Sequence, residues 1–190
     1  MAKIMAENLN QSDQGQEVIS TVGMTVALVS FAMLFATLMM GFAMFRFTAP
    51  VWPPAGMNRP SLILPTLSTL SIFLSSLSYM WFEKDIANKK GLILTIILGL
   101  GFMLLQSLLW GHLKSQGIFV SSGIFPSIIY AFTWIHAAHI VAAIGLLFWL
   151  LNFALKEINA KARRRASSVG KFWHFLGIVW FIMFMTIFVL

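Results

Sequence analysis

The sequence contains no cysteine, and only 10% of its 190 residues are charged. Without thiols the chain cannot form disulfides, iron–sulfur clusters or thiolate metal sites. There are only six acidic residues, and all of them lie outside the five longest apolar runs. No acid is therefore placed to orient a histidine as a general base within those runs, and no Gly-rich phosphate loop is present. These absences exclude nucleophilic catalysis and phosphate binding.

The sequence is rich instead in long apolar runs. Hydrophobic residues make up 59% of the chain, against about 45–50% in soluble domains. A helix needs about 20 apolar residues to cross a bilayer, and in hydrocarbon its backbone groups must pair within their own segment. The sequence therefore predicts an all-α integral membrane bundle of five transmembrane helices in residues 21–190, after a polar N-terminal arm at 1–20. The predicted spans are 22–45, 61–82, 91–113, 125–152 and 171–190.

The basic residues predict the orientation of these helices. The formal net charge of +7 does not point to nucleic acid as a partner, because the charges lie in short loops between apolar runs. Ten of the thirteen basic residues fall on one side, which the positive-inside rule assigns to the cytoplasm. They are Lys3, Lys84, Lys89, Lys90, Lys156, Lys161, Arg163, Arg164, Arg165 and Lys171. We expect a cytoplasmic N-terminus and a C-terminus outside.

Histidines are the most chemically suggestive residues within the spans. His136 and His139 are three residues apart and share a helical face, where a polar group needs a partner. Haem or metal ligation is one interpretation, and hydrogen bonding in a helix interface or beside a lipid headgroup is the other. A shared haem needs matched depths, but His139 is about 20 Å from the cytoplasmic end of its span and His174 about 5 Å from the start of the next. With no carboxylate for a non-haem site, we expect no metal here.

Two further patterns concern packing and the membrane surface. The serines of the second span recur at spacings of 3, 4 and 3, which favours helix–helix packing over a water or substrate path; they are Ser68, Ser71, Ser75 and Ser78. Four tryptophans lie near predicted helix ends, at the level of the lipid headgroups; they are Trp81, Trp110, Trp149 and Trp173. The run Arg163–Arg165 either attracts anionic headgroups, at about 1 kcal/mol per residue, or only sets the topology.

Five segments, in order, resemble the subunit III family of the haem–copper terminal oxidases. Residues 52–56 are similar to its W-P-P-x-G segment, and a Ser/Thr-rich second span and Gln106 late in the third follow. The sequence H-A-A-H at 136–139 resembles the family's H-x-x-H, and F-W-H-F at 172–175 with V-W at 179–180 resembles its Y-W-H-F-V-D-x-V-W. The resemblance runs from about residue 25 to the end and matches the short, five-helix bacterial form.

Three departures from the family pattern all remove an acid. Phe31 stands near the place of a glutamate, Leu109 replaces an acid three residues after Gln106, and Gly177 replaces the aspartate of the last motif. Roles that depend on those carboxylates are therefore not carried over. A divergent branch is implied.

The resemblance implies a subunit without redox centres in the inner membrane of a bacterial cell. It would pack against oxidase subunits I and II, which carry the haems and copper, bind phospholipid in a cleft between its first two and remaining helices, and support proton uptake and sustained turnover. No catalytic, cofactor or metal residue is expected. The expected lipid or subunit contacts are Trp52, His136, His139, Trp173 and His174.

Other functions stay open at this point. The resemblance implies a subunit of a cytochrome c oxidase, and the nearest alternative is an accessory subunit of a quinol oxidase or nitric oxide reductase. An independent haem b cytochrome and a small transporter are alternatives from other classes. The sequence does not identify the electron donor, nor does it decide membership of a respiratory supercomplex.

Overall fold

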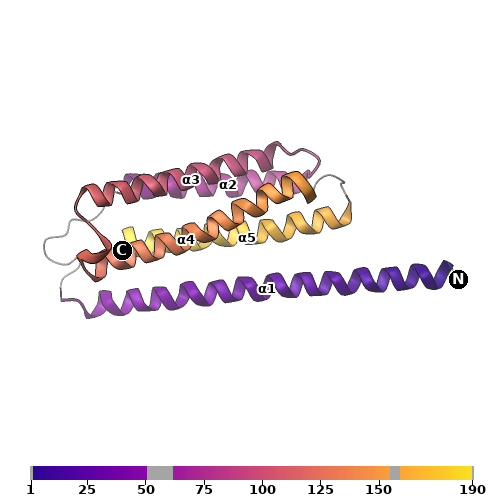
Figure 1. Ribbon diagram of the computed structural model, residues 1–190, viewed down its shortest axis with the longest axis horizontal. Helices are drawn as coiled ribbons and strands as arrows, with labels where there is room; N and C mark the ends of the chain where they lie inside the picture. Colours follow the sequence, from indigo (N-terminus) through magenta and orange to yellow (C-terminus); the bar gives the residue numbers. More distant parts are fainter. Residues whose placement is uncertain (1, 51–61, 155–158, 190) are drawn as a thin grey trace. The chain divides into compact units, whose positions relative to one another are not determined.

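The computed structural model describes residues 2–50, 62–154 and 159–189. This part of the chain is dominated by five long helices (Figure 1), each with a segment long and apolar enough to cross a membrane. The prediction of an all-α protein with five membrane-spanning helices is confirmed. Their bounds are α1 Ala2–Thr48, α2 Ile63–Lys84, α3 Lys90–Ser115, α4 Ile124–Trp149 and α5 Ala160–Phe184, with π-helical turns continuing α4 over Leu150–Ala154 and α5 over Met185–Val189.

The chain divides into two compact units, Met1–Thr37 and Leu38–Leu190. The first unit consists of the greater part of α1, which runs through residue 20 without a break, so the predicted polar arm is helical from residue 2 onward. The second unit contains the end of α1 and helices α2 to α5. All geometry below concerns the second unit.

Helices α2 to α5 form a closed four-helix bundle (Figure 1), in which each helix packs on the next and α5 returns to α2. One side chain from each helix meets in its central layer. The Trp180 ring stands edge-on to Phe102 at 4.9 Å between centroids and lies 5.4 Å from the ring of His136. Its Nε1 donates to Thr69 Oγ1 at 3.0 Å. Because the three rings are 0% exposed, side chains fill the middle of the bundle.

The serine face of α2 joins it to α3. Three serine hydroxyls donate to α3 carbonyls: Ser71 to Leu98 at 2.9 Å, Ser75 to Thr95 at 3.1 Å and Ser78 to Gly91 at 2.8 Å. Ser68 donates to Leu64 within its own helix. A Cβ on Gly91 would lie 2.9 Å from the Ser78 carbonyl oxygen, so the two backbones approach as closely as glycine allows. The packing interpretation of the serines is confirmed, and it follows the small-residue logic of helix association in lipid.

Helix α5 begins at Ala160, eleven residues before the span that the sequence predicts. Asn159 caps it, its Oδ1 accepting from the Ala162 amide at 2.9 Å. Basic residues made this segment look like a loop, but they occupy only its exposed side, while Ala162, Ala166 and Val169 are buried at helical spacing. The first turns of α5 are therefore an amphipathic extension of the bundle.

This early start corrects two expectations. Trp173 does not lie near a helix end: it is thirteen residues into α5 and 1% exposed. A Cβ on Gly99 of α3 would lie 2.8 Å from Trp173 Cη2, so the indole fills the space that this glycine leaves. His174 is likewise about 21 Å from the helix start and not about 5 Å. The depth argument against a shared haem is therefore weaker than the sequence indicated.

Candidate functional site

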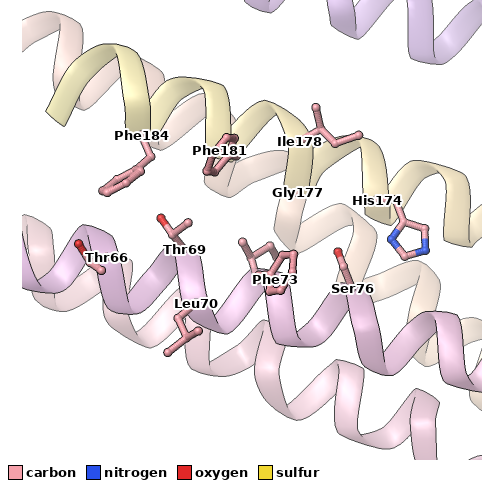
Figure 2. A pocket seen from close by; sticks show the side chains of 11 residues that line it. Thr66, Thr69, Leu70, Phe73, Ser76, His174, Gly177, Ile178, Phe181 and Phe184 are labelled. Atoms are coloured by element: carbon pink, nitrogen blue, oxygen red, sulfur yellow. The ribbon is translucent and has the colours of Figure 1, made fainter. Parts of the chain in front are cut away.

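A groove of about 610 Å³ lies between α2 and α5 (Figure 2). Its apolar lining residues include Phe73 from α2 and Ile178, Phe181 and Phe184 from α5. We call it the α2–α5 groove. It offers a few polar groups on an apolar surface, which is the composition of a ligand-binding site.

Helical spacing in both helices produces the α2–α5 groove. Positions 66, 69, 73 and 76 recur at intervals of 3, 4 and 3 and so share one face of α2, and 174, 177, 178 and 181 share one face of α5. Gly177 lets the two helices approach each other closely. A Cβ at Gly177 would lie 3.2 Å from Ser76 Oγ, so a larger side chain there would push α2 and α5 apart.

Polar groups cluster at one end of the groove, where His174 and Ser76 lie (Figure 2). The His174 ring stands edge-on to Tyr79 at 5.8 Å between centroids, and the Tyr79 hydroxyl donates to the Ala166 carbonyl at 2.7 Å. Tyr79 is 0% exposed, so this contact limits the movement of the imidazole. Within the described part of the chain, His174 Nε2 has no hydrogen-bond partner.

A pair of opposite charges lies beyond this polar end. Glu83, in the last turn of α2, packs against α5, where a Cβ on Gly170 would lie 2.5 Å from Glu83 Oε1. Glu83 also interacts electrostatically with Lys171. Lys171 is exposed and precedes His174 by three residues, which places it on the groove face of α5.

The structure does not gather the five sequence-predicted contact residues into one site. Trp52 lies outside the described residues. His136 is 0% exposed in the bundle centre, and Trp173 is 1% exposed against α3. His139 is partly exposed, and its Nδ1 donates to the Ile135 carbonyl one turn earlier, at 2.7 Å. Of the four predicted contact residues that the structure describes, only His174 lines the α2–α5 groove.

Sequence reasoning missed most of the groove residues. Thr69 and Ser76 belong to a face of α2 next to the serine face, and Gly177 drew attention only as a lost acid. The sequence feature that indicates this face is the spacing of Thr66, Thr69, Phe73 and Ser76 along one side of α2. The sequence singles out Gln106 only because it matches a glutamine of the family pattern. The structure shows that Gln106 is 0% exposed and that, within the described residues, neither its amide oxygen nor its amide nitrogen has a hydrogen-bond partner.

The sequence also matches a family of known proteins. The model for cytochrome c oxidase subunit III matches residues 3–190, nearly the whole chain. The chain belongs to the cytochrome c oxidase subunit III family. The resemblance carried by the five ordered segments is thereby confirmed.

Bacterial and animal members of the subunit III family are similar to the chain. It is 29% identical over 180 residues to the probable cytochrome c oxidase subunit 3 of Mycobacterium leprae, covering 88% of this chain and 86% of that protein. It is 25% identical over 179 residues to cytochrome c oxidase subunit 3 of Synechocystis sp., covering 88% and 74%. The match to the Petromyzon marinus protein, 27% identical over 145 residues, covers 72% of this chain and only 54% of the relative. The chain thus spans about half the length of the animal relative.

The membrane histidines are expected to bind no metal, and this can be measured. In the described residues no group of three or more His, Asp or Glu side chains could hold an ion. His139 already uses Nδ1 in a backbone hydrogen bond, and His136 is enclosed by the Trp180 and Phe102 rings. Metal and haem analysis of the purified chain and of His136→Ala, His139→Ala and His174→Ala should give the same substoichiometric content. Haem or metal that disappears with one substitution would contradict this prediction.

Proposed function

We propose that this chain is the non-catalytic subunit III of an aerobic respiratory haem–copper oxidase, of the cytochrome c oxidase type. It contributes no redox centre and packs against the catalytic subunit in a bacterial inner membrane. The match of the family over residues 3–190 carries this proposal. The bacterial relatives support it, since both bear the name of this oxidase subunit.

The interior of the second unit supports a role without cofactors. The bundle centre is occupied by the Trp180, Phe102 and His136 rings, which are 0% exposed and packed at 4.9–6.0 Å between centroids. A haem would have to displace this layer. Redox chemistry is therefore assigned to partner subunits I and II.

The outer surface supports a role in packing and lipid binding. Large apolar side chains on α2 and α3 are exposed, including Phe73 at 60%, Ile97 at 59% and Leu104 at 63%. In a membrane such a surface is covered by lipid or by a partner helix, with association driven by packing. The chain would thus stabilise the oxidase and its lipid surroundings, and through them sustain proton uptake over many turnovers.

If the chain supports proton uptake by the oxidase, it does so without carrying protons on the side chains at positions 109 and 177. Leu109 is 1% exposed where the family pattern has an acid, and Gly177 lines the α2–α5 groove where it has an aspartate. Neither residue can carry a proton.

Affinity purification tests the proposed function. The chain, tagged and extracted from its own membranes in mild detergent, is expected to bring along haem–copper subunits I and II, identified by mass spectrometry. An unrelated tagged membrane protein from the same cells is the control. Recovery of the chain as a self-contained oligomer would favour a transporter and contradict the proposal.

The proposed orientation predicts which side of the membrane single cysteines face. The chain has no cysteine of its own, so Ser167→Cys and Ser121→Cys each give one thiol at an exposed position. Ser167 lies near the start of α5 and Ser121 between α3 and α4, on opposite sides of the membrane. An impermeant maleimide added to intact cells should label position 121 and not 167. Labelling at position 167 and not at 121 would show that the orientation is the opposite of the one proposed.

A further inference from the structure

The side chain of Gln106 lies in the interior of the second unit, and the proposed function gives it no role. It is 0% exposed, and within the described residues neither its Oε1 nor its Nε2 has a hydrogen-bond partner. We infer that Gln106 holds ordered water inside the bundle, where α3 meets α4 between the levels of His136 and Thr133. The inference concerns the bundle itself and does not depend on the proposed function.

Helical spacing places Gln106 on the face of α3 that meets α4. Phe102, one turn before it, packs edge-on against the ring of His136 in α4, at 6.0 Å between centroids. Trp110, one turn after it, donates from Nε1 to Thr133 Oγ1 of α4 at 3.0 Å. Residues four apart share a helical face. Gln106 therefore lies between these two contacts and faces the same stretch of α4.

A primary amide in this position needs partners. Its oxygen accepts hydrogen bonds and its NH₂ group donates two, and burial without partners costs free energy. Proteins satisfy such groups with buried water, which makes about three hydrogen bonds to the polar atoms around it. A methionine would fill a similar volume without this cost, so the amide indicates a ligand that forms hydrogen bonds.

The chemistry around Gln106 selects water as that ligand. Thr133 Oγ1 accepts from Trp110 and donates to the Ile129 carbonyl at 2.8 Å, so the hydroxyl has one lone pair left to accept a further bond. Water both donates and accepts, and it therefore suits the amide oxygen, the amide nitrogen and this lone pair. Gln106 and Thr133 are uncharged, so an ion would meet no opposite charge on either residue.

The packing of α3 leaves more room toward α4 than toward α2. Toward α2 the backbones meet closely, since a Cβ on Gly91 would lie 2.9 Å from the Ser78 carbonyl oxygen. Helix α3 contacts α4 much less extensively, and the large side chains of Phe102 and Trp110 span the distance between them. One water occupies about 30 Å³, a volume that fits between such rings.

This water would join α3 to α4 through the bundle interior. The serine hydroxyls of α2 donate directly to α3 carbonyls, whereas α3 and α4 are farther apart and would be linked from Gln106 to Thr133 through water. Hydrogen bonds of this kind stabilise helix association in lipid, where hydrophobicity does not drive it.

Density for the water tests the inference directly. The full chain would be purified in mild detergent with the subunits that accompany it, and imaged by cryo-electron microscopy at a resolution that shows ordered water. We expect a peak within hydrogen-bond distance of the Gln106 amide, on the side of Thr133. Gln106→Met should remove the peak. Ser107→Ala should keep it, because the Ser107 hydroxyl bonds to the Met103 carbonyl of its own helix at 3.0 Å. An amide bonded only to protein groups, or a peak that survives Gln106→Met, would overturn the inference.

Radiolytic footprinting of the unmodified chain covers the case in which Gln106→Met fails to fold. Hydroxyl radicals produced from bound water oxidise the side chains beside it, including buried ones. Phe102 and Phe82 are almost equally buried, at 0% and 1% exposure, but Phe82 lies beside Tyr79 near the other end of the bundle. We expect oxidation of Phe102 to exceed that of Phe82. Oxidation of Phe102 that is no greater than that of Phe82 would overturn the inference.

Discussion

Cells that lack this chain are expected to keep the haem absorbance of their oxidase and its initial rate of oxygen reduction, but to lose sustained turnover several-fold. The reason is that under the proposed function the chain supplies no ligand to a haem, in keeping with a described core that is filled by its own side chains, with Trp180 and His136 at 0% exposure. The catalytic subunit would nevertheless lose an apolar packing partner. Spectra of membranes and oxygen consumption over many turnovers measure the two effects separately.

The absence of acids at three positions where the family pattern has them leads to a further expectation about proton pumping. Phe31, Leu109 and Gly177 carry no proton, so the pumping stoichiometry in the first turnovers should not change on deletion. Re-expression of the unmodified chain should restore durability. An immediate and complete loss of the haem signal would show instead that the chain is needed for cofactor assembly, and the proposed role would be wrong.

Gly91→Leu is expected to destabilise the described bundle strongly. A Cβ at this position would lie 2.9 Å from Phe82 Cβ and 2.9 Å from the Ser78 carbonyl oxygen. Neither neighbour can yield, because Phe82 is 1% exposed and the oxygen belongs to the backbone. The helices must separate, which breaks the Ser78–Gly91 hydrogen bond. We expect a loss of about 3 kcal/mol in stability, measured as earlier thermal unfolding in detergent.

Gly145→Leu provides the control for that substitution. A Cβ on Gly145 would meet nothing within 4 Å, so this variant should unfold close to the temperature of the unmodified chain. Equal stability of the Gly91 and Gly145 variants would mean that α2 and α3 are not closely packed.

Much of the fold could be predicted from the sequence because membrane helices leave few alternatives. The five spans follow from length and hydropathy, and the serine spacing of 3, 4 and 3 predicted the face of α2 that meets α3. The start of α5 was missed because Lys161 and Arg163–Arg165 resemble a loop. Only the burial of Ala162 and Ala166 on the other side shows that the helix continues.

The candidate site could be predicted from the sequence less well than the fold. A groove depends on which faces of two distant helices meet, and the sequence does not say that α2 faces α5. The sequence predicts Trp173 at the level of the lipid headgroups, since nothing local reveals that Gly99 leaves room for its indole. The sequence predicts His174 as a contact residue, but its groove neighbours Ser76 and Gly177 become apparent only when the two helices are placed together.

The most direct test of the central claim is the absorbance of this chain after separation from its complex. The purified oxidase would be dissociated, and haem and copper would be measured in the separated chain and in the remaining subunits. We predict a colourless chain, with all of the haem and copper in the subunits that co-purified with it. A Soret band that stays with this chain, or its isolation without any haem–copper partner, would contradict the assignment.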